Sequence, residues 1–204
     1  MLSTNSLCLR IGGKIMHSLL LQPNSTAQWH ALVSEAEKDC AIHLKDELEA
    51  YLVFLLIRFI NQPNLASSLL GLEFLLGIDQ QIHSQHYNSL KDVGDKCLLF
   101  AGLFPNRAVK KRVKVSYFVK LGQAAYSTLS THFSAQEALF IQLCLEFPRM
   151  MDVLNAMRKT QNSADNLLQS LELWHETGSQ AAWRRLCDAS KGLPMIPQNK
   201  KSIH

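Results

Sequence analysis

The densest group of chemically active side chains in this sequence is a run of cations between residues 107 and 120. These 14 positions hold six of the 21 lysines and arginines in the chain: Arg107, Lys110, Lys111, Arg112, Lys114 and Lys120. If residues 107–114 are helical, four of the cations share one face, because they are spaced at i, i+3, i+4 and i+7. Such a face attracts phosphates, lipid head groups or an acidic protein surface. The sequence therefore predicts a ligand- or partner-binding surface over residues 107–114, with Tyr117 beside it.

A solvated helix face is the competing interpretation of the same run of charges. Like charges four residues apart on a helix repel by a few tenths of a kcal/mol, so a facing acidic group or ligand would stabilise the arrangement. The acidic turn at residues 46–49 is an internal candidate for that group. Tyr117 and Tyr126 could stack on a ligand near the cations, but their helical spacing within an apolar stripe favours core positions.

Residues with metal-binding or catalytic chemistry do not form a complete motif. Glu172 and His175 form one Glu-x-x-His pair, whereas a di-metal site in a helical bundle needs two such pairs and two further glutamates. His83 and His86, with Asp79 before them, could share a helix face, but the residues that follow are more typical of a frayed helix end. We therefore predict no metal site and no cofactor.

Other motifs of enzyme chemistry are also missing from the sequence. The five cysteines lie at least 32 residues apart, which excludes a closely spaced pair of metal ligands. The glycine patterns of a phosphate loop, a dinucleotide-binding fold and a hydrolase elbow do not occur. The sequence gives no positive sign of an enzyme, and the prediction favours a non-enzymatic protein.

Length and composition are those of one globular domain. The chain has 204 residues, of which 47% are hydrophobic and 19% charged, and its formal net charge is +4. This charge is too small to favour nucleic-acid binding. The longest apolar run covers residues 51–57, whereas a membrane-spanning helix needs roughly 20 apolar residues. We therefore predict no membrane span and, because no secretory signal is recognisable, a cytoplasmic location.

The elements that carry these side chains are all predicted to be helices. Apolar spacing and helix-stop signals predict helices over 25–40, 43–61, 65–82, 88–104, 113–132, 134–159 with a bend near Pro148, 163–176 and 179–189. Ser134 and Glu137 have the spacing of a capping box. Gly71, Gly77, Gly94 and Gly102 could mark close helix crossings, and Gly122, with Ala124 and Ala125, would permit close helix approach. The predicted fold is an all-α, single-domain bundle of about seven helices over 25–190, after a poorly defined segment 1–24 and before a mobile tail 191–204.

Two segments of the chain resemble a group of bacterial helical proteins for which no activity is assigned. The segments are VGDKCLLFAGLFP and VKVSYFVKLGQAAYSTLS. A weaker match lies within residues 51–56, and the resemblance covers about 80 residues in all. The matching residues are Gly94, Asp95, Leu99, Gly102, Phe104, Tyr117, Gly122, Ala125 and Tyr126. The resemblance implies a bacterial helical protein and assigns no ligand or catalytic residue. Where that group tends to have an acidic residue before the tyrosine-rich helix, this chain has Lys114 and Ser116.

Two functions from different classes fit the sequence. The first is a non-enzymatic interaction module that binds a protein partner or a second copy of itself through its apolar helices and the basic face at 107–114. The alternative is a protein that binds an anion, a phosphate or an apolar ligand, and that could include an enzyme. The residues alone do not identify the partner or the ligand.

Overall fold

All the secondary structure that the computed structural model describes is helical, which confirms the predicted fold class. The structure describes residues 25–60, 83–105, 113–132, 136–158 and 167–190. These residues form eight helices: α2 (Ser25–Cys40), α3 (Asp46–Ile60), α5 (His83–Leu103), α7 (Val115–His132), α8 (Glu137–Leu145), α9 (Phe147–Ala156), α10 (Leu167–Thr177) and α11 (Gln180–Ser190). The predicted helix over 65–82 and the predicted end segments 1–24 and 191–204 lie outside the described residues.

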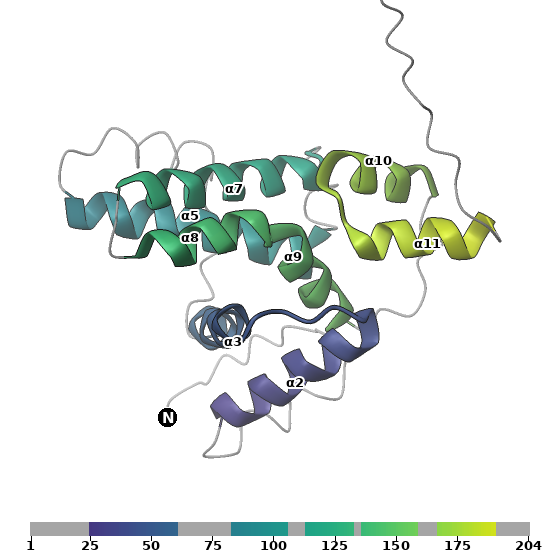
Figure 1. Cartoon of the computed structure of the whole chain (residues 1–204), viewed down its shortest axis with the longest axis horizontal. Coiled ribbons are helices and arrows are strands. Elements are labelled where there is room, and N and C mark those ends of the chain that lie inside the picture. Colours follow the sequence, from purple (N-terminus) through teal and green to yellow (C-terminus); the bar gives the residue numbers. More distant parts are fainter. Residues whose placement is uncertain (1–24, 61–82, 106–112, 133–135, 159–166, 191–204) are drawn as a thin grey trace, which may run out of the picture.

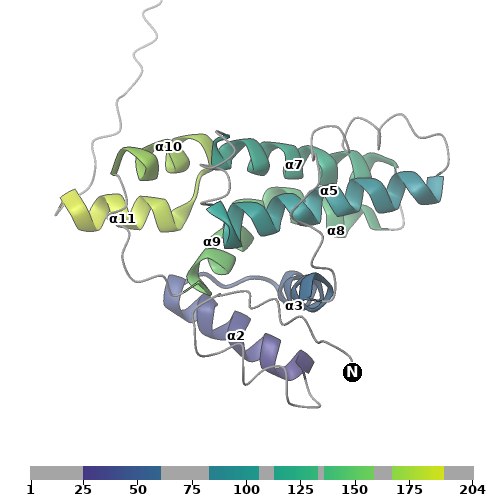
Figure 2. The same cartoon turned by 180° about the vertical axis from the view of Figure 1, so that it is seen from behind.

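The helices are arranged around a central pair, α5 and α7. Helix α8 packs against α7, and all three run side by side in both views of the molecule (Figures 1 and 2). Helix α3 crosses beneath them, and α9 leads from α5 to α2. Helices α10 and α11 form a hairpin at the opposite end of the molecule from the start of α5, where α10 contacts α7 and α11 contacts α9. The chain thus consists of a bundle and an attached helical hairpin.

Two glycines allow the central helices to approach closely. A Cβ added at Gly94 would lie 2.5 Å from the ring of Tyr126, and one added at Gly122 would overlap the ring of Phe147. Both rings are fully buried. The predicted close crossings at Gly94 and Gly122 are therefore confirmed, and the aromatic core depends on the lack of a side chain at both positions.

The first turns of α5 differ from the sequence prediction. The predicted helix starts at residue 88, whereas α5 starts at His83, so His83 and His86 lie in the first turn of a helix. The Tyr87 ring packs edge-on against Phe140 at 5.8 Å, and its hydroxyl donates a hydrogen bond to Gln136 Oε1 at 2.6 Å. These contacts with the α8 region anchor the first turns of α5, which local sequence signals could not reveal.

The predicted long helix over 134–159 is two helices. Helices α8 and α9 meet at Glu146, which is the C-cap of the first and the N-cap of the second. Pro148 lies in the first turn of α9, where a proline removes no helical hydrogen bond. Gln136 is the N-cap of α8 and makes no side-chain capping bond, and Ser134 of the predicted capping box lies outside the described residues. The proline therefore starts a new helix instead of bending one.

The hairpin is held together by an aromatic pair. The rings of Trp174 on α10 and Trp183 on α11 have centroids 4.5 Å apart. Gly178, in the connection, has a φ of 73°, a backbone conformation that glycine adopts without strain. No helix among the described residues is long and apolar enough to cross a membrane.

Candidate functional site

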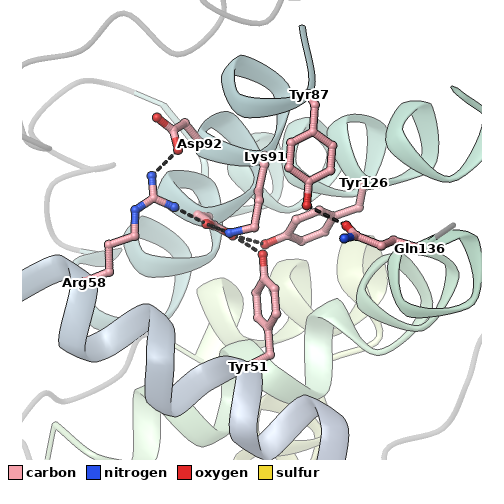
Figure 3. Close-up of polar contacts among 8 residues, drawn as sticks. Tyr51, Arg58, Tyr87, Lys91, Asp92, Tyr126 and Gln136 are labelled. Atoms are coloured by element: carbon pink, nitrogen blue, oxygen red, sulfur yellow. Dashed lines mark hydrogen bonds and ion pairs between the residues drawn. The ribbon is translucent and has the colours of Figure 1, made fainter. Parts of the chain in front are cut away.

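Asp95 is the centre of the largest polar cluster that the structure describes. Its side chain is buried on α5 and accepts hydrogen bonds at both oxygens. Oδ1 accepts from the hydroxyls of Tyr51 and of Tyr126, the latter at 2.8 Å. Oδ2 accepts from Arg58 Nη1 at 2.9 Å and from Lys91 Nζ at 3.1 Å. In Figure 3 the side chains of Tyr51, Arg58, Lys91 and Tyr126, which come from three helices, point toward one another. The Asp95 cluster is our name for Asp95, these four partners and Asp92.

The charges of the Asp95 cluster balance internally. Arg58 Nη2 donates a second hydrogen bond to Asp92, so the cluster has two carboxylates and two cations. The Asp95 side chain is 4% exposed, whereas those of Arg58 and Asp92 are 34% and 40% exposed. The centre of the cluster is therefore buried, and its outer edge is exposed to solvent. Because its charges cancel, it presents no net charge to a ligand.

Helical spacing explains how three separate segments supply the cluster. Tyr51 and Arg58 are seven residues apart and lie on one face of α3, and Lys91 and Asp95 are four apart on α5. The Lys91 ammonium also lies 5.2 Å from the centroid of the Tyr51 ring. Tyr126 comes from α7, and the gap at Gly94 admits its ring beside Asp95. The Asp95 cluster therefore joins α3, α5 and α7.

The two phenols that contact Asp95 are donors and stay protonated. Burial raises the pKa of the Tyr126 hydroxyl well above its ordinary value, and the negative charge of Asp95 raises it further. The same two causes raise the pKa of Tyr51. Neither phenol therefore supplies a phenolate base or nucleophile, and both oxygens of Asp95 are occupied by donors. In this arrangement, Asp95 and the two phenols connect α3, α5 and α7.

Most of the predicted basic face lies outside the described residues. Arg107, Lys110, Lys111 and Arg112 belong to that part of the chain. Lys114 is described and exposed, and its ammonium lies 3.3 Å from Glu176 and 3.7 Å from Glu172, both on α10. The hydrogen bond to Glu176 raises the pKa of Lys114. For Lys114 the facing acidic group is thus on α10, and not the turn at 46–49 that the sequence suggested.

The two tyrosines that were expected in the core have different environments. Tyr126 is fully buried, as predicted, but Tyr117 is 44% exposed. The expectation for Tyr117 came from apolar residues that recur every four positions: Val113, Tyr117, Leu121, Ala125 and Leu129. Such a repeat advances about 40° around a helix at each step, so its first members leave the buried face. The buried face of α7 instead includes Phe118, Gly122 and Ala125. The structure places Tyr117 and Lys114 on the same turn, where the Tyr117 amide donates to the Lys114 carbonyl at 3.1 Å.

A second buried carboxylate, Asp152, attaches the hairpin to the bundle. Asp152 lies on α9 and accepts hydrogen bonds from Ser179 Oγ at 2.7 Å and from the Ala181 amide at 3.0 Å. Ser179 Oγ in turn accepts from the Ala182 amide at 3.1 Å, which caps the N-terminus of α11. Burial raises the pKa of Asp152. Sequence analysis missed this role, because a cap supplied by another helix leaves no local signal.

An exposed apolar surface lies on α10. Leu167, Leu168 and Leu171 are 51%, 59% and 42% exposed, and we call these three side chains the leucine face. Ser170, three residues after Leu167 on α10, is buried. Phe54 on α3 and Leu145 on α8 are also exposed. The leucine face is distinctive because its three members are adjacent on one helix and lie beside Glu172.

The described residues contain no group of three or more side chains placed to bind a metal ion. Glu172 and His175 are both exposed, which agrees with their interpretation as part of a solvated helix face.

Some of the residues on which the predicted resemblance rests meet at the crossing of α5 and α7. Gly94, Asp95 and Tyr126 are three of them, and they form the contact between the Tyr126 ring, the Gly94 backbone and the Asp95 carboxylate. Gly122 is a fourth and contacts Phe147. These four residues therefore lie at close contacts between helices.

No family model, curated protein or solved structure matches this chain. The resemblance to bacterial helical proteins thus stays a prediction.

Proposed function

We propose that this chain is a non-enzymatic interaction module that binds another protein through the leucine face of α10. The observation that carries the proposal is the exposure of Leu167, Leu168 and Leu171 on one side of a single helix. Removing a leucine side chain fully from water is worth about 1.5–3 kcal/mol. A cluster of three such side chains on a folded surface is a feature of protein-binding faces.

The attachment of the hairpin supports this use of α10. Asp152 caps α11 from the bundle, and Lys114 on the bundle pairs with Glu172 and Glu176 on α10. The helix that carries the leucine face is therefore already ordered. A preorganised face binds a partner with less loss of conformational entropy than a segment that folds on binding.

The Asp95 cluster supports the non-enzymatic part of the proposal. Both oxygens of Asp95 accept hydrogen bonds from within the chain, and the charges of Arg58 and Lys91 are balanced by Asp92 and Asp95. A general base would need a free acceptor oxygen or a phenol with a lowered pKa. Asp95, Tyr51 and Tyr126 have neither of these properties.

The alternative function, an anion or ligand site on the basic face at 107–114, is not favoured by Lys114. Its ammonium already contacts two carboxylates of α10. The other four cations of residues 107–114 lie outside the described residues.

Site-specific photo-cross-linking tests the proposal in cells that express the chain. Benzoylphenylalanine is placed at Leu168, or in a matched control at Gln169, which is also exposed but about 100° away around α10. We expect a discrete protein adduct from position 168, lost when Leu167 and Leu171 are changed to serine. Equal adducts from both positions, or none from position 168, would contradict the proposal.

A further inference from the structure

The charged residues beside the leucine face indicate which kind of partner it fits. Glu172 follows Leu168 by four residues, and Glu176 follows Glu172 by four, so the carboxylates form an acidic edge along one side of the leucine face. The Glu172 side chain is 47% exposed, and that of Glu176 is 27% exposed. Hydrogen bonds from Ser116 and Lys114 lower the pKa of Glu176, which keeps it charged.

The acidic edge already binds one ammonium group within the chain. Lys114 Nζ lies 3.3 Å from Glu176 and 3.7 Å from Glu172, and the Lys114 side chain remains 61% exposed. Glu176 is also close enough to Lys120 to be affected by its positive charge, whereas Glu172 is the more exposed carboxylate and lies farther from Lys114. Glu172 can therefore accept a second cation from a partner whose apolar side chains cover the leucine face.

We infer that the partner of the leucine face is a basic amphipathic helix of another protein. Such a helix inserts an apolar stripe between Leu167, Leu168 and Leu171 and places a lysine or arginine beside Glu172. Antiparallel pairing with a second copy of the chain fits less well. An antiparallel two-fold pairing centred on Leu171 would bring the two Glu172 carboxylates to the same side of the contact, where like charges repel. This inference rests on the proposed function and adds the chemistry of the partner.

Two synthetic peptides test the inference on the full chain. One is an 18-residue helix with a leucine stripe flanked by lysines, and the other has the same stripe flanked by glutamates. Binding is measured by fluorescence anisotropy of the labelled peptides. We expect saturable binding of the lysine peptide and weaker binding of the glutamate peptide. Because the whole chain carries a net charge of +4, non-specific attraction would give the opposite preference.

Two substitutions within the same ion pair should have opposite effects. Glu172→Gln should weaken binding of the lysine peptide about two- to fivefold, the range of a surface ion pair. Lys114→Gln should strengthen it, because the acidic edge loses its internal cation. Circular dichroism and thermal unfolding confirm that both variants fold, and misfolding could not produce effects of opposite sign.

The outcomes separate this inference from the proposed function. If the triple variant Leu167→Ser, Leu168→Ser, Leu171→Ser binds the lysine peptide as well as the wild type does, the leucine face is not the docking site and both ideas fail. If the leucines are required but the two peptides bind equally, the inference about charge fails and the proposed function stands. Binding to vesicles of anionic lipid without binding to either peptide would also overturn both.

Discussion

Asp95 and Asp152 are both buried carboxylates that connect helices, but they are neutralised in different ways. Asp95 contacts two cations and two phenols, whereas Asp152 contacts one hydroxyl and a backbone amide at the start of α11. Asp95 joins three helices of the bundle, and Asp152 joins the bundle to the hairpin. The comparison suggests that the bundle is held by a charged network, and the hairpin by a helix cap that can open without disrupting the bundle.

The largest effect should come from Asp95→Ala. The substitution leaves Arg58 and Lys91 without their shared carboxylate and two buried hydroxyls without an acceptor. Breaking a buried charged network in this way costs about 3–5 kcal/mol. We expect that loss in the free energy of unfolding measured with urea. Asp92→Asn is the control at the exposed edge, and a similar loss there would refute the central role of Asp95.

Asp152→Ala should have a smaller and more local effect. It leaves the Ala181 amide at the start of α11 and the buried Ser179 hydroxyl without their acceptor, which costs about 1–3 kcal/mol. The loss should concentrate in the hairpin. Hydrogen exchange of amides in 180–190 should accelerate, while exchange in α5 and α7 stays at the wild-type rate. Uniform acceleration would show that the hairpin and the bundle unfold together.

High pH offers a third test that affects only the Asp95 side of the comparison. The pKa of Tyr126 is raised in the folded chain, so its contribution to stability is fully present below the unfolded pKa of about 10. It decreases as the pH rises further, because the unfolded chain loses its phenolic proton first. The slope is about 1.4 kcal/mol per pH unit for each phenol. Tyr126→Phe should show a shallower loss of stability above pH 10, and an unchanged slope would contradict this account.

The smallest effect on stability should come from Lys114→Gln. Its ion pairs with Glu172 and Glu176 lie at the surface, where water and salt screen them. We expect no measurable change in the midpoint of urea unfolding at physiological salt. A shift as large as that of Asp152→Ala would mean that these ion pairs, and not the cap, hold the hairpin in place.

Helix positions could be predicted from the sequence much better than the candidate site. Apolar spacing and proline signals identified α2 with its bounds and located α7, α10 and α11 within a few residues. The Asp95 cluster could not be derived in this way, because Tyr51, Asp95 and Tyr126 are far apart in the chain and each lies in an apolar stripe. The density of charges along the sequence directed the prediction to residues 107–114. The structural importance of a polar residue such as Asp95 comes from its burial, and burial depends on tertiary packing.

The aromatic pair of the hairpin provides an optical label for its release. Trp174 and Trp183 are two of the three tryptophans in the chain, and their ring centroids are 4.5 Å apart. The excited states of two indole rings this close are coupled. The circular dichroism signal of the pair should therefore depend on the hairpin being intact. The third, Trp29, is buried in the bundle. The tryptophan emission of a Trp29→Phe variant would come entirely from the hairpin. Detachment of the hairpin could therefore be followed separately from the melting of the bundle.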